Sequence, residues 1–108
     1  MRFYKKLYYG EEARKNKAKI FSKIKRNSFS SDTYLITLAS NPENLLDIIS
    51  ANVFNQPHFK KQKNHEDILV VGIAKGEAES YELVRQIVDE MYKKQGDFNI
   101  REFLEIKG

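Results

Sequence analysis

The stretch from Ile68 to Glu79, ILVVGIAKGEAE, joins an apolar strand to a helix and decides the fold of this 108-residue chain. Residues 68–74 are apolar at every position except Gly72. A strand that is apolar on both faces is covered on both faces, as in the middle of a parallel sheet. Residues 77–94 then place apolar side chains on one half of the helical wheel and charged ones on the other, and Gly96 predicts the end of this helix. The segment therefore predicts a central strand followed by a long amphipathic helix.

The segments on either side of this strand-helix unit also alternate between predicted strands and predicted helices. The sequence predicts a charged edge strand over 2–9, a helix over 11–26, a β-branched strand over 33–39, and a helix that begins at Asn41-Pro42 and buries Leu45, Leu46, Ile48 and Ile49. Residues 52–64 predict an irregular connection, and Asn99 predicts the cap of a short last helix. We therefore expect a single α/β domain over 1–108, in which a small three-stranded, mostly parallel sheet in the order β-α-β-α-β-α plus a short C-terminal helix is flanked by helices.

Composition restricts the classes to which the protein can belong. Hydrophobic residues make up 41% and charged residues 31%, which is typical of a folded globular chain rather than a disordered one. The absence of cysteine excludes disulfides and thiolate metal sites. We find no signal-peptide pattern and no apolar run long enough for a membrane span, so we expect a cytoplasmic protein without a membrane partner. The formal net charge of +4 is uneven, because residues 1–26 hold ten Lys or Arg and only two Glu. Such a concentration of positive charge predicts an acidic partner.

Three segments together resemble a family of short, uncharacterised bacterial proteins. They are KKLYYGEEARKNKAKIFSKIKR at 5–26, YLITLASNPENLLDII at 34–49 and LVVGIAKGEAESYELVRQIVDEMY at 69–92. The resemblance covers most of the chain and implies a free-standing single domain. It implies no activity, ligand or site residue.

The turn Ala74-Lys75-Gly76 does not match a phosphate-binding loop. A P-loop requires G-x-x-x-x-G-K-[ST], whereas here Lys75 precedes its glycine and Glu77 occupies the lysine position. Glu77 and Glu79 also place carboxylates in the first turn of the helix, where they complement the dipole and repel a phosphate. The simplest interpretation is a tight turn in which Gly76 adopts a positive φ.

Acidic residues open each predicted helix. If the three strands are parallel, these turns meet along the carboxyl edge of the sheet, where open α/β sheets bind ligands. The resulting rim would combine carboxylates with a few polar groups and one cation: Glu11, Ser40, Asn41, Glu43, Lys75 and Glu77. A divalent cation or a cationic ligand would suit this rim, but the simpler interpretation is that each carboxylate caps its own helix.

The predicted helix over 11–26 carries a ridge of basic residues opposite its apolar face. With a further basic cluster in the irregular segment, the candidate contact residues for nucleic acid or an acidic protein are Lys15, Lys19, Lys23, Arg26, Lys60 and Lys61. Lysines spaced in this way can follow a phosphate backbone, and Tyr4, Tyr8 and Tyr9 would offer stacking surfaces nearby. The alternative is that lysine is used here for helix propensity and solubility. Lys17 lies within the apolar face, where its head either reaches solvent or pairs with an acid.

Other chemistry has little support in the sequence. His58 and His65 are spaced unlike any zinc motif, and Ser40 lacks the G-x-S-x-G context of a nucleophile. We therefore assign no catalytic residue, no metal ligand and no cofactor. The preferred hypothesis is a non-enzymatic binding module, and the alternative is a small enzyme or a divalent-metal-binding domain that uses the carboxylate rim. A homodimer through Val53, Phe54 and Phe59 is a further possibility.

Overall fold

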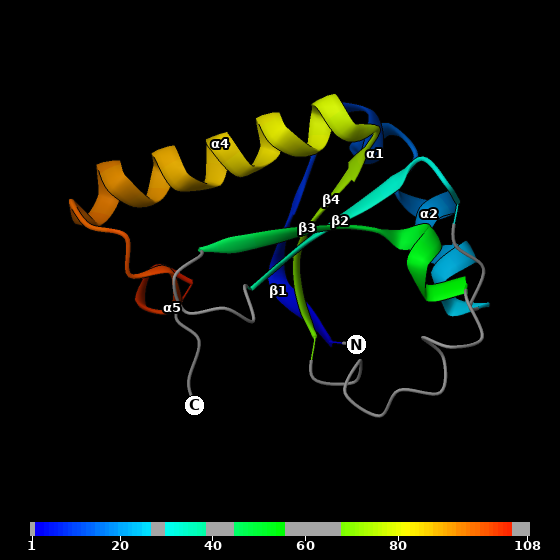
Figure 1. Ribbon diagram of the computed structural model, residues 1–108, viewed down its shortest axis with the longest axis horizontal. Coiled ribbons are helices and arrows are strands. Elements are labelled where there is room, and N and C mark those ends of the chain that lie inside the picture. The colour runs from blue at the N-terminus through cyan, green and yellow to red at the C-terminus, as the bar shows by residue number, and fades with distance from the viewer. Residues whose placement is uncertain (1, 27–29, 39–44, 56–67, 105–108) are drawn as a thin grey trace.

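The computed structural model describes residues 2–26, 30–38, 45–55 and 68–104. They form a four-stranded mixed sheet with helices on both faces (Figure 1). In chain order the elements are β1 (Arg2–Tyr9), α1 (Glu11–Lys15), α2 (Lys17–Lys25), β2 (Thr33–Leu38), β3 (Leu46–Ser50), the 3-10 helix η1 (Ala51–Asn55), β4 (Leu69–Lys75), α4 (Glu77–Gln95) and α5 (Ile100–Phe103). None of the helices in these described ranges has the length and apolar character that crossing a membrane requires.

The order of the strands is β1-β4-β2-β3, and only β1 and β4 are parallel. Strand β2 is antiparallel to both of its neighbours, β3 and β4. The prediction of an α/β domain with β4 inside the sheet and β1 at its edge is confirmed. The prediction of three mostly parallel strands was wrong, because it assumed a helical crossover directly after β2, and a strand lies there instead.

That strand is β3, which occupies part of the segment predicted as a helix after Pro42. Leu46, Ile48 and Ser50 pair with Leu38, Ile36 and Tyr34 of β2. The apolar pairs at 45–46 and 48–49 fit a helical period, but they also fit a strand with both faces covered. Leu46 and Ile48 pack on one side of the sheet and Ile49 on the other. The proposed cap residues of the helix, Asn41 and Pro42, lie outside the described residues.

The helix predicted over 11–26 is divided in two at Asn16. The backbone of Asn16 is not helical, with φ −111° and ψ 19°, and its side-chain Nδ2 donates to the carbonyl of Glu12 at 2.9 Å. Asparagine side chains compete for backbone groups in this way, which favours a local break. The break interrupts the helix between Lys15 and Lys17, so α1 and α2 do not form one continuous helix.

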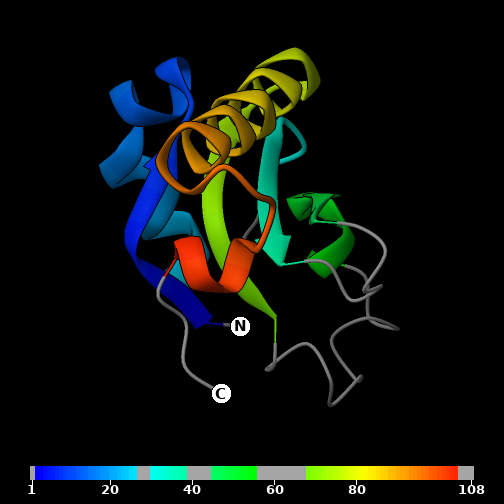
Figure 2. The same cartoon turned by 90° about the vertical axis from the view of Figure 1, so that its left-hand side faces the viewer.

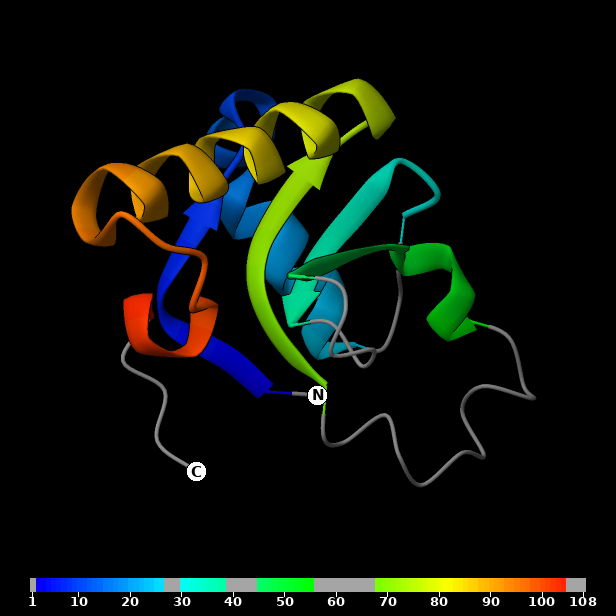
Figure 3. The same cartoon turned by 60° about the vertical axis from the view of Figure 1, so that its left-hand side comes forward.

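The sheet has a separate core on each face. On the α2 side, Leu35, Val70 and Ile73 pack with residues of α1, α2 and η1. On the α4 side, Ile36, Val71 and Ala74 pack with residues of α4 and α5. Figures 2 and 3 show α4 and α5 covering one face of β1 and β4, with α1 and α2 behind the sheet. Strand β4 is thus covered on both faces, as its sequence predicted.

In the C-terminal third of the chain, the structure confirms the helix ends and caps that the sequence predicted. Helix α4 ends at Gly96, whose φ of 74° is left-handed, and Gly76 before the helix has a φ of 87°. Asn99 caps α5 by accepting a hydrogen bond from the amide of Glu102 at 3.2 Å. These local signals are strong because each depends on one residue and its immediate neighbours in the chain.

Candidate functional site

The start of β2 and the end of β4 meet at one edge of the sheet. Because the two strands are antiparallel, Thr33 pairs with Lys75. The amide of Gly76 also donates to the carbonyl of Asp32 at 2.7 Å. The chain just before β2 therefore lies against the turn that leads from β4 into α4.

A cavity of about 130 Å³ opens at this edge, between α2 and the two strand ends. Its lining is mainly polar and comes from four segments: Asn16, Lys19, Ile20, Lys23, Ser30, Asp32, Thr33 and Lys75. We call this the basic cavity, because three lysines and a single acidic residue line it. A water molecule takes up about 30 Å³ of liquid volume, so the cavity has room for roughly four waters or one small anionic group.

Two of the three lysines make a polar contact within this lining. Lys23 Nζ donates to Ser30 Oγ at 2.9 Å, and Lys75 Nζ lies 3.9 Å from Asp32 Oδ2. Lys19 is one helical turn before Lys23, so both side chains lie on the same face of α2. The hydroxyls of Ser30 and Thr33 add short polar groups at the strand end. Ammonium and hydroxyl donors converging on one small cavity are suited to a phosphate or carboxylate group.

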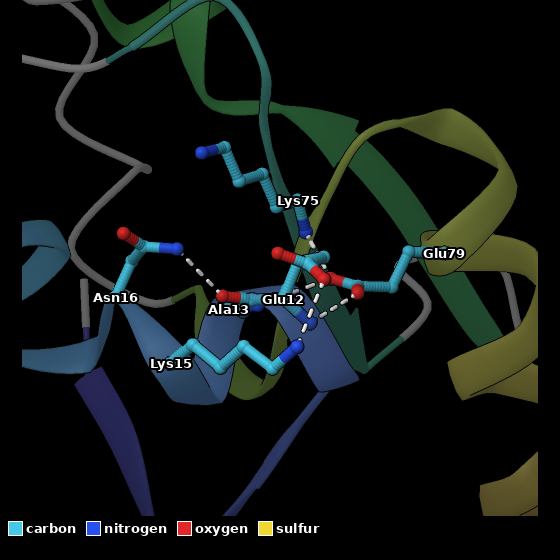
Figure 4. Close-up of polar contacts among 6 residues, drawn as sticks. All are labelled: Glu12, Ala13, Lys15, Asn16, Lys75 and Glu79. Carbon is cyan, nitrogen blue, oxygen red and sulfur yellow. Dashed lines mark hydrogen bonds and ion pairs between the residues drawn. The ribbon is translucent and has the colours of Figure 1, made fainter.

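A second feature of the same edge is the carboxylate of Glu79, which joins two turns of the backbone (Figure 4). It accepts the amides of Glu12 at 2.6 Å and Ala13 at 3.3 Å in α1, and the amide of Lys75 at 2.5 Å. Glu79 thus supplies an internal anion to the N-terminal amides of a neighbouring helix. Its contact with the amide of Lys75 lies at the start of its own helix, whereas its contacts with Glu12 and Ala13 were not predicted. The turn at Lys75 and Gly76 does not cradle an external phosphate, because a side chain of the protein already accepts its amide.

The approach of Glu79 to α1 depends on Gly10. A Cβ atom at position 10 would lie 2.4 Å from Cγ, Cδ and Oε2 of Glu79. Glycine is therefore required there for space and not for backbone conformation, since its φ of −66° is open to any residue.

Only some residues of the predicted basic ridge lie together in the structure. Lys19 and Lys23 line the basic cavity, whereas Lys15 pairs with Glu12 at 3.4 Å and Arg26 Nε donates to the carbonyl of Ser22 at 3.3 Å. Lys60 and Lys61 lie outside the described residues. Lys17, whose partner the sequence left open, places its Nζ 5.1 Å from the ring centroid of Tyr9 in a cation–π contact.

The predicted carboxylate rim requires β2 and β4 to end at the same edge of the sheet. Strand β2 ends at the opposite edge from Glu11, Lys75 and Glu77, because it runs antiparallel to β4. Ser40, Asn41 and Glu43, which follow β2, lie outside the described residues. Glu77 is exposed and accepts a hydrogen bond from the hydroxyl of Tyr81. In the described part of the chain, no three His, Asp or Glu side chains are grouped so as to hold a metal ion.

The sequence interpretation missed Asn16, Ser30, Asp32 and Thr33 as lining residues. Residues 30–32, just before β2, were given no role, and in the parallel sheet that the sequence predicted they would lie at the far edge. The signal that could have found them is the direction of β2. An antiparallel strand brings the residues before it, and not those after it, to the edge where Lys75 lies.

Comparison with known proteins adds no relative: no protein-family model, curated protein or solved structure matches this chain.

Proposed function

We propose that this protein is a non-enzymatic binding module that takes a phosphate group of a nucleic acid into the basic cavity. The observation that carries the proposal is the convergence of Lys19, Lys23 and Lys75 on one small polar cavity. The lysines come from two segments far apart in the sequence, and such convergence is not needed for solubility or helix propensity.

Charge around the cavity supports a polyanion rather than a single ion. Lys15, Lys25 and Arg26 are exposed on α1 and at the end of α2, on either side of the lysines that line the cavity. A nucleic acid places phosphates at regular intervals, so one phosphate in the cavity brings its neighbours near these outer cations. The outer contacts would be exposed and sensitive to salt, whereas the cavity would determine the register.

The carboxylate rim offers no comparable support for an enzyme or a metal site. Glu79 accepts three backbone amides, Glu12 pairs with Lys15, and Glu77 accepts the hydroxyl of Tyr81. Glu79 holds the two turns together, whereas Glu12 and Glu77 each make a contact within their own helix. We therefore propose one function and not two.

The test is fluorescence anisotropy with a labelled single-stranded oligonucleotide, measured at several salt concentrations. The double variant Lys19→Gln/Lys23→Gln should bind at least about tenfold more weakly, and the slope of log affinity against log salt should fall by about 1 to 2, as expected when two phosphate contacts are lost. Lys93→Gln is the matched control, because Lys93 is an exposed lysine of α4 that pairs with Asp89 at 3.1 Å.

Two outcomes would overturn the proposal. One is an unchanged affinity and salt slope in the double variant. The other is equally tight binding of polyglutamate at the same salt concentration, which would show that an acidic polypeptide face is recognised through charge alone.

A further inference from the structure

A second recess lies on the other face of the sheet, between β1, the C-terminal half of α4, and α5. It has a volume of about 300 Å³ and is lined by Tyr4, Lys6, Tyr8, Glu90, Lys94 and Phe103. Figure 3 shows α5 in front of β1, below the far end of α4. Small-molecule sites begin at about this volume and typically combine aromatic walls with a few converging polar groups. We call it the aromatic recess.

The walls of the recess are three aromatic rings held by separate contacts. Tyr4, Tyr8 and Phe103 are each partly buried and pack against the core on the α4 side. The hydroxyl of Tyr8 donates to Glu90 Oε2 at 3.1 Å. Burial, followed by this hydrogen bond, raises the pKa of the Tyr8 phenol above its usual range, so the hydroxyl stays a donor and holds the ring in place.

The charges in the recess favour an anionic ligand. Two lysines and one carboxylate line it, and that carboxylate already accepts the hydroxyl of Tyr8 and, at 3.4 Å, the side-chain amide of Gln86. Lys94 lies with Nζ 5.8 Å from the ring centroid of Phe103, so its ammonium group borders the aromatic wall. Lys6 projects from the exposed edge strand β1.

We propose that the aromatic recess binds a small planar aromatic anion, with its ring against Tyr4, Tyr8 and Phe103 and its acidic group between Lys6 and Lys94. A nucleoside monophosphate is a molecule of this chemistry, since every base has a face that can stack on an aromatic side chain. The recess lies across the sheet from the basic cavity, so it is independent of the proposed nucleic-acid site.

Calorimetric titration with adenosine monophosphate, adenosine and inorganic phosphate measures separately what the aromatic ring and the acidic group contribute to the affinity. The monophosphate should bind at least about tenfold more tightly than either half, because the loss of one base stack or one charge contact is worth roughly that much. Equal affinities for the monophosphate and phosphate would overturn the proposal, since the ring would then make no contact.

Two substitutions place the ligand in this recess. Lys94→Gln should weaken monophosphate binding about three- to tenfold and leave adenosine binding unchanged, as expected for an exposed charge contact. Phe103→Leu should weaken both ligands, and circular dichroism would establish that it remains folded. Tyr8→Phe keeps the ring and should change adenosine affinity less than about twofold, whereas the monophosphate should bind more weakly because the carboxylate of Glu90 loses a donor.

Two control variants distinguish failure of the proposal for the aromatic recess from failure of the proposed nucleic-acid site. Lys93→Gln, on the neighbouring position of α4, and Lys19→Gln/Lys23→Gln, in the basic cavity, should both leave monophosphate binding unchanged. If Lys19→Gln/Lys23→Gln abolishes it while Lys94→Gln does not, the ligand occupies the basic cavity and the assignment to the aromatic recess is wrong.

Discussion

Glu79 is the residue that most clearly separates the turn between β4 and α4 from a phosphate-binding loop. Its carboxylate accepts amides from α1 and from Lys75, so two turns that are far apart in sequence share one side chain. This internal anion takes the place that a phosphate would take in a nucleotide-binding loop.

We expect Gly10→Ala to lower the free energy of unfolding by about 1–3 kcal/mol, because the new methyl group would displace the carboxylate of Glu79 and break charge-assisted hydrogen bonds. Chemical denaturation of the wild type, Gly10→Ala, Glu79→Ala and the double variant measures the effect as a cycle. In the Glu79→Ala background the cost of Gly10→Ala should fall below about 0.5 kcal/mol, since the side-chain atoms that lie nearest to the new methyl group are removed.

Glu77→Ala is the matched control for this cycle, because Glu77 is an acid of the same helical turn that does not contact α1. Its cost should stay near the 0.3–1 kcal/mol or so of an ordinary dipole contact. Additive costs of Gly10→Ala and Glu79→Ala would contradict the proposed steric link.

At the scale of elements, the break at Asn16 determines which lysines act together. A continuous helix would have extended the ridge from Lys15 through Lys23. The break leaves Lys19 and Lys23 on α2 facing the strand ends, while Lys15 pairs within α1. The lysines of the basic cavity are therefore selected by the geometry of one connection between two short helices.

The C-terminus of α4 allows a clean test of a helix stop. Gly96 has a φ of 74°, and a Cβ atom placed there would have nothing within 4 Å. We expect Gly96→Ala to destabilise the protein by roughly 1–2 kcal/mol through backbone strain alone. Gly96→Asn should cost less, because asparagine tolerates the left-handed region better. Thermal melts of the two variants would show this order, and equal melting temperatures would refute the argument.

At the scale of the whole molecule, β4 connects the two cores. It pairs with β1 on one side and β2 on the other, and Val70, Val71, Ile73 and Ala74 are all 0% exposed. The direction of β2 next to it decides which loops meet at the basic cavity. The pairing of β2 with β4 therefore determines both the topology of the sheet and the position of the basic cavity.

Native-state hydrogen exchange should be slowest at the amides of β4, because opening this strand exposes both cores and breaks two ladders. The outer strands β1 and β3 should exchange faster, since each has one neighbour in the sheet. Two-dimensional NMR after transfer to heavy water measures these rates. Protection in β1 equal to that in β4 would mean that the edge of the sheet is covered by another chain in solution.

The sequence alone determined the elements that depend on near neighbours. The doubly apolar strand at 68–74, the amphipathic helix after it, its glycine stop and the Asn99 cap were all predicted, because periodicity and capping act within a few residues of the chain. The concentration of basic residues in the first 26 positions was equally evident. It predicted a basic contact surface but not which lysines share a cavity.

Only the tertiary structure decided the direction of β2, the strand character of residues 46–50 and the meeting of Ser30, Asp32 and Lys75. The segment after Pro42 fits either a helix or a doubly covered strand until its partner is known, because the choice depends on packing between distant residues. Strand direction likewise depends on which strands pair with one another through backbone hydrogen bonds. Both outcomes are set by long-range contacts, which leave no signature in the local order of side chains.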